Sequence, residues 1–418
     1  MRRSKKVSKE ALRNARAQAV VFLKSPDFFN RLLAALDKDG FVGEERAKLA
    51  IYIVATSRFF NRPLNVILKG PSSVGKNFAA SHVLRLIPPK DVKEISSTSE
   101  RAWSYAEEDF CHKIIYLQER NQAAGAIHPS RLFISEGKLI HTVSERSGRG
   151  FSAAEHVAYG PVAFISTTTK NQIQVDDESR HVSLYSNAGT EQTKRILNRY
   201  ASNKTQLGKA ELRAWRQVQR LVRDRADTPV SLPSWFQRVA QNTYANDVKV
   251  RRYFPAFIEA CKVVALLRSF QRLKSAPSLI EIDFADFAIT TQIFEGVFTE
   301  SLHRGSEQAV ETRQTVELLS KDRDGAPVDA KALAKHLSIS KDQAYRLLRR
   351  ASATGAIRKV NPSAKTNRKL FLPVLPPRFI PDPQIIFDSC PEIESPVKFV
   401  DPLTGEEIIF RRRKSVSD

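Results

Sequence analysis

One octapeptide of this chain has the residue types needed to hold a phosphate group. The segment Gly70-Pro71-Ser72-Ser73-Val74-Gly75-Lys76-Asn77 follows the pattern GxxxxGK, with Asn77 where Ser or Thr is usual. Glycines let backbone N–H groups wrap an oligophosphate, and Lys76 would supply positive charge to its β and γ oxygens. The candidate nucleotide-binding residues are therefore Gly70, Ser72, Ser73, Val74, Gly75, Lys76 and Asn77. A chance glycine-rich turn is the alternative.

The flanking sequence predicts the strand and the helix that such a loop needs. Residues 64–69 are apolar enough for a buried parallel strand. From Asn77 to Ile87, apolar residues recur at helical spacing until Pro88-Pro89 ends the pattern. A strand, a glycine loop and a helix in this order indicate a nucleotide site.

A second candidate segment, residues 114–119, is an apolar strand that ends in polar residues. Glu119 stands where a carboxylate could polarise the attacking water, and Gln118 occupies the position of an expected magnesium-binding aspartate. A surface carboxylate at the end of a buried strand is the alternative. If magnesium binds here, Asn77 and Gln118 are its candidate contacts, through neutral amide oxygens.

Two downstream segments carry further candidates for phosphate chemistry. Hydroxyl residues 166–169 end another predicted strand, where this run of hydroxyls could contact a γ-phosphate or the attacking water. Arg180 follows Asp176-Asp177-Glu178-Ser179 and could act as an arginine finger on a neighbouring subunit's nucleotide. Threonines that only form a turn, and an ion pair of Arg180 with Asp176 or Asp177, are the alternatives.

The remaining pattern predicts a parallel α/β sheet followed by helices. Strands are expected at 66–68, 92–96, 114–117, 162–166 and 182–185, with helices between most of them and covering both faces. Two helices are expected over 8–36 and one over 44–60. Residues 207–301 read as helical throughout. After Pro373 the chain is rich in proline and is expected to be extended.

The charge balance favours a polyanionic partner. The chain has 67 Lys and Arg against 45 Asp and Glu, a net charge of +22. Nucleic acid, single- or double-stranded, is the expected partner. The sequence contains no membrane-spanning stretch and no secretion signal, so a cytoplasmic location is expected. Cys111, Cys261 and Cys390 lie far apart, which indicates neither a disulfide framework nor a zinc site.

Two basic regions are candidate DNA-binding elements. Residues 139–160 predict a hairpin whose tip carries Arg146 and Arg149. Helices at 312–320, 329–337 and 340–353, followed by strands at 357–360 and 369–372, predict a winged helix-turn-helix that offers Arg346, Arg349 and Lys369. Exposed hairpins are often basic without a function, and winged helices also bind proteins.

Taken in order, these segments resemble the AAA+ ATPases of bacterial mobile elements and phages, which are related to minichromosome-maintenance helicases and are often associated with primases. The resemblance covers roughly residues 44–371. Its segments are Gly43-Glu44, Ala55-Thr56-Ser57-Arg58, Arg62-Pro63-Leu64, the glycine loop, Glu119, Ser135-Glu136-Gly137, Gly160-Pro161-Val162, Thr167-Thr168-Thr169, Arg180, Glu191-Gln192-Thr193 and Arg251-Arg252.

The resemblance implies a P-loop AAA+ module with a parallel sheet, an α-helical lid and assembly into a homo-oligomeric ring, expected to be a hexamer. The implied cofactors are ATP and Mg2+. Lys76 and Glu119 match the phosphate-loop lysine and the hydrolytic glutamate, Thr168 a polar sensor and Arg180 the arginine finger. Arg252 or its neighbour Arg251 matches a lid arginine that contacts the γ-phosphate, and Arg146 and Arg149 match a channel hairpin.

The expected segments are a basic N-terminal helical segment (1–40), the ATPase core (41–206), the helical lid (207–310), the winged helix (311–374) and a proline-rich basic tail (375–418). The expected function is an ATP-dependent DNA helicase of a mobile element or phage. Asn77 and Gln118 depart from the family pattern, so an ATP-sensing DNA-binding initiator or regulator with weak hydrolysis is the alternative. A loader that recruits another helicase also stays open. A separate primase or polymerase is a possible partner.

Overall fold

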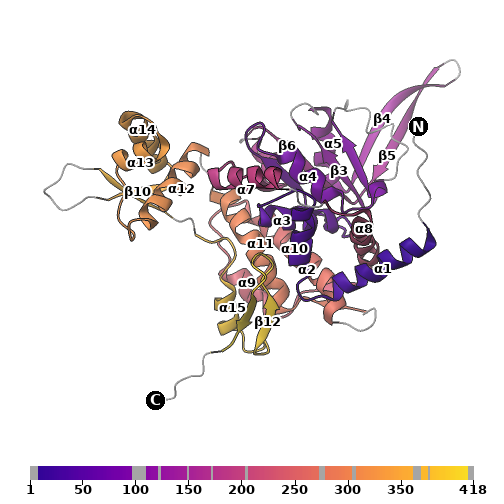
Figure 1. Ribbon diagram of the computed structural model, residues 1–418. Helices are drawn as coiled ribbons and strands as arrows, with labels where there is room; N and C mark the ends of the chain where they lie inside the picture. Colours follow the sequence, from indigo (N-terminus) through magenta and orange to yellow (C-terminus); the bar gives the residue numbers. More distant parts are fainter. Residues whose placement is uncertain are drawn as a thin grey trace. The chain divides into compact units, whose positions relative to one another are not determined.

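The computed structural model describes residues 8–96, 110–120, 124–147, 150–170, 173–202, 206–272, 278–303, 307–360, 369–374 and 377–412. The chain divides into two units (Figure 1). The larger unit contains Met1–Phe298 and Ile380–Asp418, and the smaller unit contains Thr299–Phe379.

A five-stranded parallel sheet forms the centre of the larger unit. The strands are β1 (Val66–Lys69), β2 (Val92–Ile95), β3 (Lys113–Leu117), β6 (Val162–Thr168) and β7 (Val182–Tyr185). Their order across the sheet is β2-β3-β6-β1-β7, and every neighbouring pair is parallel. The predicted parallel sheet is therefore confirmed, with β1 flanked on both sides.

Helices cover both faces of this sheet. Successive side chains of a strand point to opposite faces, and on β3 Ile115 faces the cluster that contains Phe133 of α5 (Ile127–Glu136). Tyr116 faces the other way, where its hydroxyl lies near Ser81 of α4 (Lys76–Leu84). Helix α4 in turn contacts α3 (Glu45–Ser57).

The larger unit contains further helices. These elements are α1 (Lys9–Lys24), α2 (Phe28–Lys38), α6 (Val175–Glu178), α7 (Thr190–Ala201), α8 (Lys209–Arg223), α9 (Phe236–Asn242), α10 (Val250–Arg272) and α11 (Phe284–His303). Two short 3-10 turns cover Pro89–Asp91 and Ala124–Ala126. Helices α1 and α8 pack on each other, and Phe22 of α1 stacks on the buried Trp215 of α8 with ring centroids 4.7 Å apart. The predicted segment boundaries at residues 40 and 206 both lie inside the larger unit and do not divide it into compact parts.

The expectation that residues 207–301 are helical throughout is wrong. The short strands β8 (Val230–Ser231) and β9 (Ile280–Glu281) pair in parallel between the helices. Two-residue strands give too short an alternation to stand out from the helical pattern around them.

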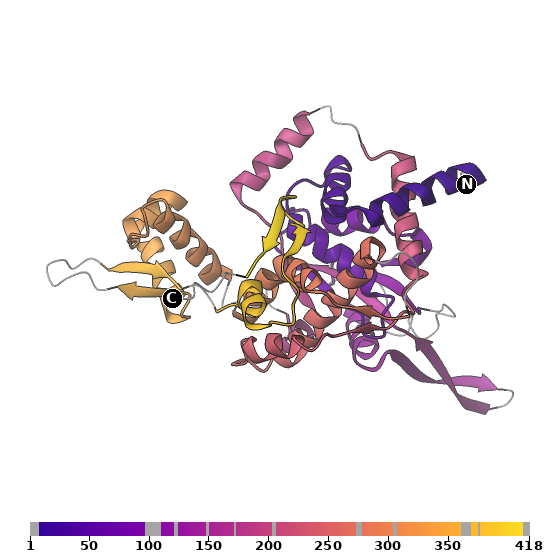
Figure 2. The same ribbon diagram turned by 90° about the horizontal axis from the view of Figure 1, so that it is seen from below.

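The predicted hairpin forms and has a sheet of its own. Strands β4 (Lys138–Ser147) and β5 (Gly150–Tyr159) pair antiparallel from Lys138 and Tyr159 to Ser147 and Gly150. Both views show it extending away from the five-stranded sheet (Figures 1 and 2).

The smaller unit contains the predicted three helices and hairpin. Its elements are α12 (Glu307–Lys321), α13 (Ala330–Leu337), α14 (Lys341–Ala353), β10 (Ile357–Val360) and β11 (Leu370–Pro373). Leu333, Leu348 and Phe371 lie in its core. Ser340 caps α14, as predicted, in a reciprocal capping box with Gln343.

The expectation of an extended tail after Pro373 is wrong. The chain returns to the larger unit as α15 (Pro383–Ser389), β12 (Val397–Val400) and β13 (Glu407–Phe410). Phe387 and Phe410 pack on Phe284 with ring centroids 5.2 and 5.0 Å away. Pro383 occupies the first turn of α15, a position that favours a helix rather than breaking it.

In the part of the chain that the structure describes, every helix is too short or too polar to cross a membrane.

Candidate functional site

The glycine loop, residues 70–77, connects the carboxyl end of β1 to the start of α4. Gly70, Ser73 and Gly75 have positive φ angles of 148°, 68° and 94°. A Cβ atom at Gly70 would lie 3.2 Å from Cγ1 of Val74. The two glycines therefore provide a backbone path that other residues adopt only with strain, while Ser72 and Ser73 are exposed.

Lys76 begins α4 and turns back over the loop. Its side chain is buried, and Nζ donates to the carbonyl oxygens of Gly70 at 2.9 Å and Pro71 at 2.6 Å. Burial lowers the pKa of Lys76, and the negative charge of nearby Glu119 opposes this shift. The ammonium is thus hydrogen-bonded to neutral oxygens, which leaves its charge available to an anion.

Residues from three separate segments meet beside this lysine. Glu119 follows β3, and its backbone N–H donates to Oγ1 of Thr167 at 3.0 Å. The Thr167 hydroxyl in turn donates to Oδ1 of Asn77 at 2.7 Å. The predicted candidates Asn77 and Glu119 are therefore brought together, and Thr167 links them.

The hydroxyl of this contact belongs to Thr167, whereas the family resemblance implies Thr168 as the polar sensor. Oγ1 of Thr168 accepts a hydrogen bond from the backbone N–H of Lys170 at 3.1 Å. Adjacent residues of a strand face opposite sides of the sheet, so only one of the two threonines can face Asn77. The run of hydroxyl residues indicated the strand end but not which residue faces the loop.

Gln118 points toward β2 rather than toward Asn77. Its Nε2 donates to Oε2 of Glu94 at 3.4 Å. Among the described residues, no group of three or more His, Cys, Asp and Glu side chains could hold a metal ion. Of the two residues predicted to contact magnesium, only Asn77 lies in the group formed with Glu119 and Thr167. Gln118 lies outside this group.

A cavity of about 580 Å³ lies beside α7 and the segment before α3. It is lined by Asp37, Lys38, Val42, Gly43, Glu45, Arg195, Asn198 and Arg199. This region is joined to the glycine loop, because the Asn187 N–H donates to Oε1 of Glu44 at 2.8 Å and the Ser186 N–H donates to the Lys69 carbonyl at 3.1 Å. Arg195 and Arg199 lie outside the motifs predicted from the sequence, although residues 191–193 of the same helix belong to one of them.

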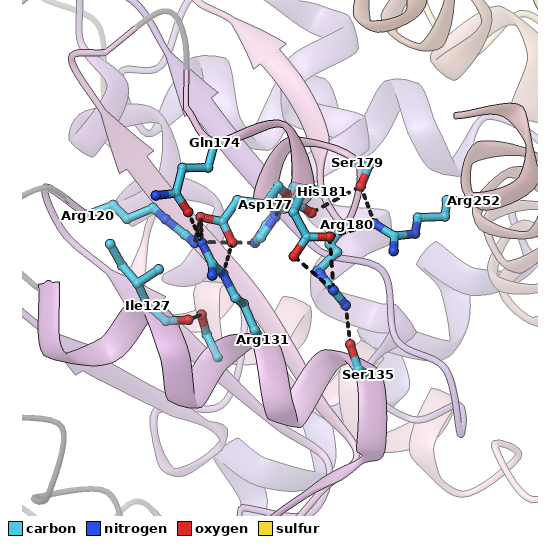
Figure 3. A network of polar contacts seen from close by, with 12 residues as sticks. Arg120, Ile127, Arg131, Ser135, Gln174, Asp177, Ser179, Arg180, His181 and Arg252 are labelled. Carbon is cyan, nitrogen blue, oxygen red and sulfur yellow. Dashed lines mark hydrogen bonds and ion pairs between the residues drawn. The ribbon is translucent and has the colours of Figure 1, made fainter. Parts of the chain in front are cut away.

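Arg180 and Arg252 form a second polar group, held by one carboxylate (Figure 3). Nη2 of Arg180 lies 3.1 Å from both carboxylate oxygens of Asp176, and Nη1 of Arg252 lies 3.4 Å from one of them. Arg180 also donates to Ser135, and Arg252 donates to Ser179. We call Arg180 and Arg252 the arginine pair. The ion pair of Arg180 with Asp176 is the local alternative expected from the sequence.

The arginine pair lies at the opposite edge of the sheet from the glycine loop. The Val182 N–H donates to the Asn65 carbonyl at 2.7 Å, so Arg180 precedes the amino ends of β7 and β1. Lys76 follows the carboxyl end of β1. Four strand residues at about 3.3 Å each separate the two edges by about 10 Å or more. The structure therefore does not bring Arg252 to the glycine loop of its own chain.

The arginine pair borders a second cavity, of about 570 Å³. Its lining includes Arg62, Arg180, Arg251 and Arg252 together with Asn65 and Glu259. This concentration of guanidinium groups favours an anionic ligand.

The predicted DNA contacts fall in two places. Arg146 belongs to β4, opposite Phe151, and Arg149 lies outside the described residues. Arg346, Arg349 and Lys369 are exposed on the smaller unit, the first two on α14 and Lys369 directly before β11. Lys369 Nζ donates to the Tyr345 hydroxyl at 2.7 Å, which joins the hairpin to α14.

A comparison of the chain with models of known protein families and with curated proteins finds no match to either.

Proposed function

We propose that the larger unit binds ATP through the glycine loop and hydrolyses it. The observation that carries this proposal is the meeting of Lys76, Asn77 and Glu119 at the carboxyl edge of a parallel sheet. Ligands of open α/β sheets bind outside the carboxyl ends of the strands. The N-terminus of α4 and the Lys76 ammonium together suit a triphosphate.

Each residue of this group would have a distinct part in the reaction. Lys76 would bind the β- and γ-phosphates, and the Glu119 carboxylate would orient and polarise the attacking water. Asn77 would offer an amide oxygen to magnesium, whose other ligands would be phosphates and water, as is common for this ion. Bound magnesium would neutralise phosphate charge. Thr167 would hold Asn77 and the backbone of Glu119 in register.

The arginine pair would complete a neighbouring subunit's site. Both arginines are too far from their own glycine loop to touch the same nucleotide. Asp176 holds them at a surface, where its side chain is 52% exposed. A phosphate of the next subunit would take the place of Asp176. This arrangement supports a ring, expected to be a hexamer, and the AAA+ module with a helical lid that the sequence resembles.

The smaller unit would bind duplex DNA as a winged helix, and the β4–β5 hairpin would bind a strand within the ring. The exposed arginines of α14 and the net charge of +22 support phosphate contacts. The proposed activity is that of an ATP-dependent DNA helicase of a mobile element or phage. A DNA-bound initiator with weak hydrolysis is the second candidate, favoured by the orientation of the Gln118 amide toward Glu94.

The direct test is steady-state ATP hydrolysis with and without single-stranded DNA. A helicase should hydrolyse ATP faster when DNA is added, and Glu119→Gln should reduce kcat by about 10²- to 10⁴-fold while nucleotide binding persists. ATP binding without turnover, unaffected by DNA, would identify the initiator. Absence of ATP binding would refute both candidates.

Duplex binding is tested by charge reversal on α14. Arg346→Glu with Arg349→Glu should weaken duplex affinity about tenfold or more and reduce its salt dependence, without removing the stimulation of hydrolysis by single strands. Lys331→Glu with Lys335→Glu on α13 is the matched control. Point variants are preferable to truncation after Ser320, because truncation also removes the segment that packs on Phe284.

A further inference from the structure

Helix α6 contains three consecutive acids, and each one binds a different set of cations. The helix is a single turn, Val175–Glu178, directly before β7. Asp176 holds the arginine pair at the amino edge of the sheet. Asp177 and Glu178 are directed to buried cations that lie next to the predicted nucleotide residues.

Glu178 connects α6 to the glycine loop. Its carboxylate forms an ion pair with Nζ of Lys69, whose side chain is fully buried. Lys69 is the last residue of β1 and is bonded directly to Gly70. Its ammonium also lies 5.5 Å from the ring centre of Tyr185 on β7. A movement of the backbone at Lys69 and Gly70 would therefore also displace the carboxylate of Glu178.

Asp177 connects α6 to the segment that carries Glu119. Its Oδ2 lies 3.2 Å from Nη2 of the buried Arg120, the residue after Glu119. The Arg120 backbone N–H donates to the Thr167 carbonyl at 2.8 Å. Asp177 also pairs with Arg131 of α5, with Nη2 2.8 Å from Oδ2. Figure 3 shows these groups around Asp177.

The side chains of Lys69, Arg120 and Asp177 are buried. His181, also buried, donates from Nδ1 to the Asp177 carbonyl at 2.7 Å, and its Nε2 lies 3.5 Å from Nη1 of Arg120. Burial lowers the pKa of His181 to about 3, and the positive charge of Arg120 adds to the shift. Ion pairs in such a setting are costly to break, because the remaining partner is left buried without its counter-charge.

We propose that Asp177 and Glu178 are positioning residues that link the nucleotide end of a subunit to the arginine pair that the same subunit presents to its neighbour. The inference rests on the proposed function. Nucleotide binding at the glycine loop moves Lys69 or Arg120, the acids of α6 follow their cations, and Asp176 follows them. The orientation of Arg180 and Arg252 then depends on the nucleotide bound in their own subunit.

Hydrogen exchange of the full chain tests this link without requiring hydrolysis. Saturating ATPγS with Mg2+ should slow exchange over residues 173–185 about fivefold or more in the wild-type protein. Lys69→Met with Glu178→Leu removes both partners of one link, so that neither charge stays buried alone. This variant should bind the nucleotide with nearly wild-type affinity but show clearly less slowing over 173–185 than the wild-type protein, because only the link through Asp177 remains.

Arg58→Met with Asp91→Leu is the matched control. Arg58 is as buried as Lys69, and Asp91 is 15% exposed against 19% for Glu178. This control should show the wild-type slowing. Nucleotide binding without slowing in the wild-type protein, or equal slowing in the Lys69 and Glu178 variant, would overturn the link but not the proposed function. Absence of nucleotide binding would refute both.

Discussion

The two edges of the sheet hold their cations in different ways. At the carboxyl edge, Lys76 is buried and donates to two backbone carbonyls. At the amino edge, Arg180 and Arg252 are partly exposed and share the carboxylate of Asp176. The hydrogen bond from Arg180 lowers the pKa of Asp176, so this carboxylate stays ionised at neutral pH.

Under the proposed function, this difference distinguishes a site for the subunit's own nucleotide from a surface that contacts a neighbouring subunit. An anion at Lys76 meets an ammonium whose partners are neutral, so no counter-charge has to leave. An anion at the arginine pair must replace Asp176. Exposed ion pairs contribute little to stability, so this exchange costs little. The first edge suits a nucleotide of the same subunit, and the second suits the phosphate of another.

The largest effect on the carboxyl edge should come from Lys76→Ala. Loss of a charge-assisted hydrogen bond weakens binding by about 1.5–3 kcal/mol, or roughly 10- to 100-fold. A titration with a fluorescent ATP analogue measures this change, and the exposed Lys90→Ala is the control. Unchanged affinity in Lys76→Ala would show that the glycine loop is only a turn and does not bind the nucleotide.

The amino edge should contribute an acid sensitivity through His181. Its pKa is about 3 in the fold and about 6.5 when unfolded. Between these values only the unfolded chain binds the proton, so the free energy of unfolding falls as the pH drops below 6.5. The loss should be about 2 kcal/mol at pH 5 relative to pH 8.

Denaturant unfolding of His181→Asn at both pH values measures this contribution. Asparagine can replace the Nδ1 donor to the Asp177 carbonyl but does not titrate, so the variant should lose about 2 kcal/mol less between pH 8 and pH 5. His128→Asn, at an exposed position, should leave the pH dependence unchanged. An equal slope in all three proteins would exclude His181 as the source.

The smallest effect should come from Asn77→Thr. A hydroxyl in place of the amide restores the usual residue of the pattern. A gain of about 0.5–1.5 kcal/mol in the free energy of magnesium binding corresponds to roughly two- to tenfold higher affinity for magnesium. The ATPase rate as a function of magnesium concentration measures it, with Asn242→Thr on α9 as the control. A slower enzyme would show that the contact between Thr167 and Asn77 matters more than a hydroxyl at position 77.

Local sequence was sufficient to predict the carboxyl edge. The strand, the glycine loop and the helix are contiguous in the chain, and Glu119 follows a second strand that is easily recognised. The residue that contacts Asn77 is Thr167 and not Thr168. The sequence could not indicate this, because a run of hydroxyl residues does not reveal which of them faces the loop.

The amino edge could be predicted only in part. Arg180 and its neighbour Asp176 are close in sequence, but Arg252 reaches them only through the packing of α10. The links from α6 to Lys69 and Arg120 also join segments that are far apart in the chain. The proline content after Pro373 predicts an extended chain, but the aromatic residues of this segment pack on Phe284, a contact that local composition does not reveal.

Mixing two inactive variants tests most directly whether the edges of different subunits form one site. Glu119→Gln retains the arginine pair, and Arg180→Ala retains the carboxyl edge. Each alone should lose about 10²-fold or more of the ATPase rate. Their mixture should hydrolyse ATP well above either parent, because a Glu119→Gln subunit can supply Arg180 to an intact carboxyl edge. A mixture no more active than its parents, with an active wild-type protein, would contradict the account.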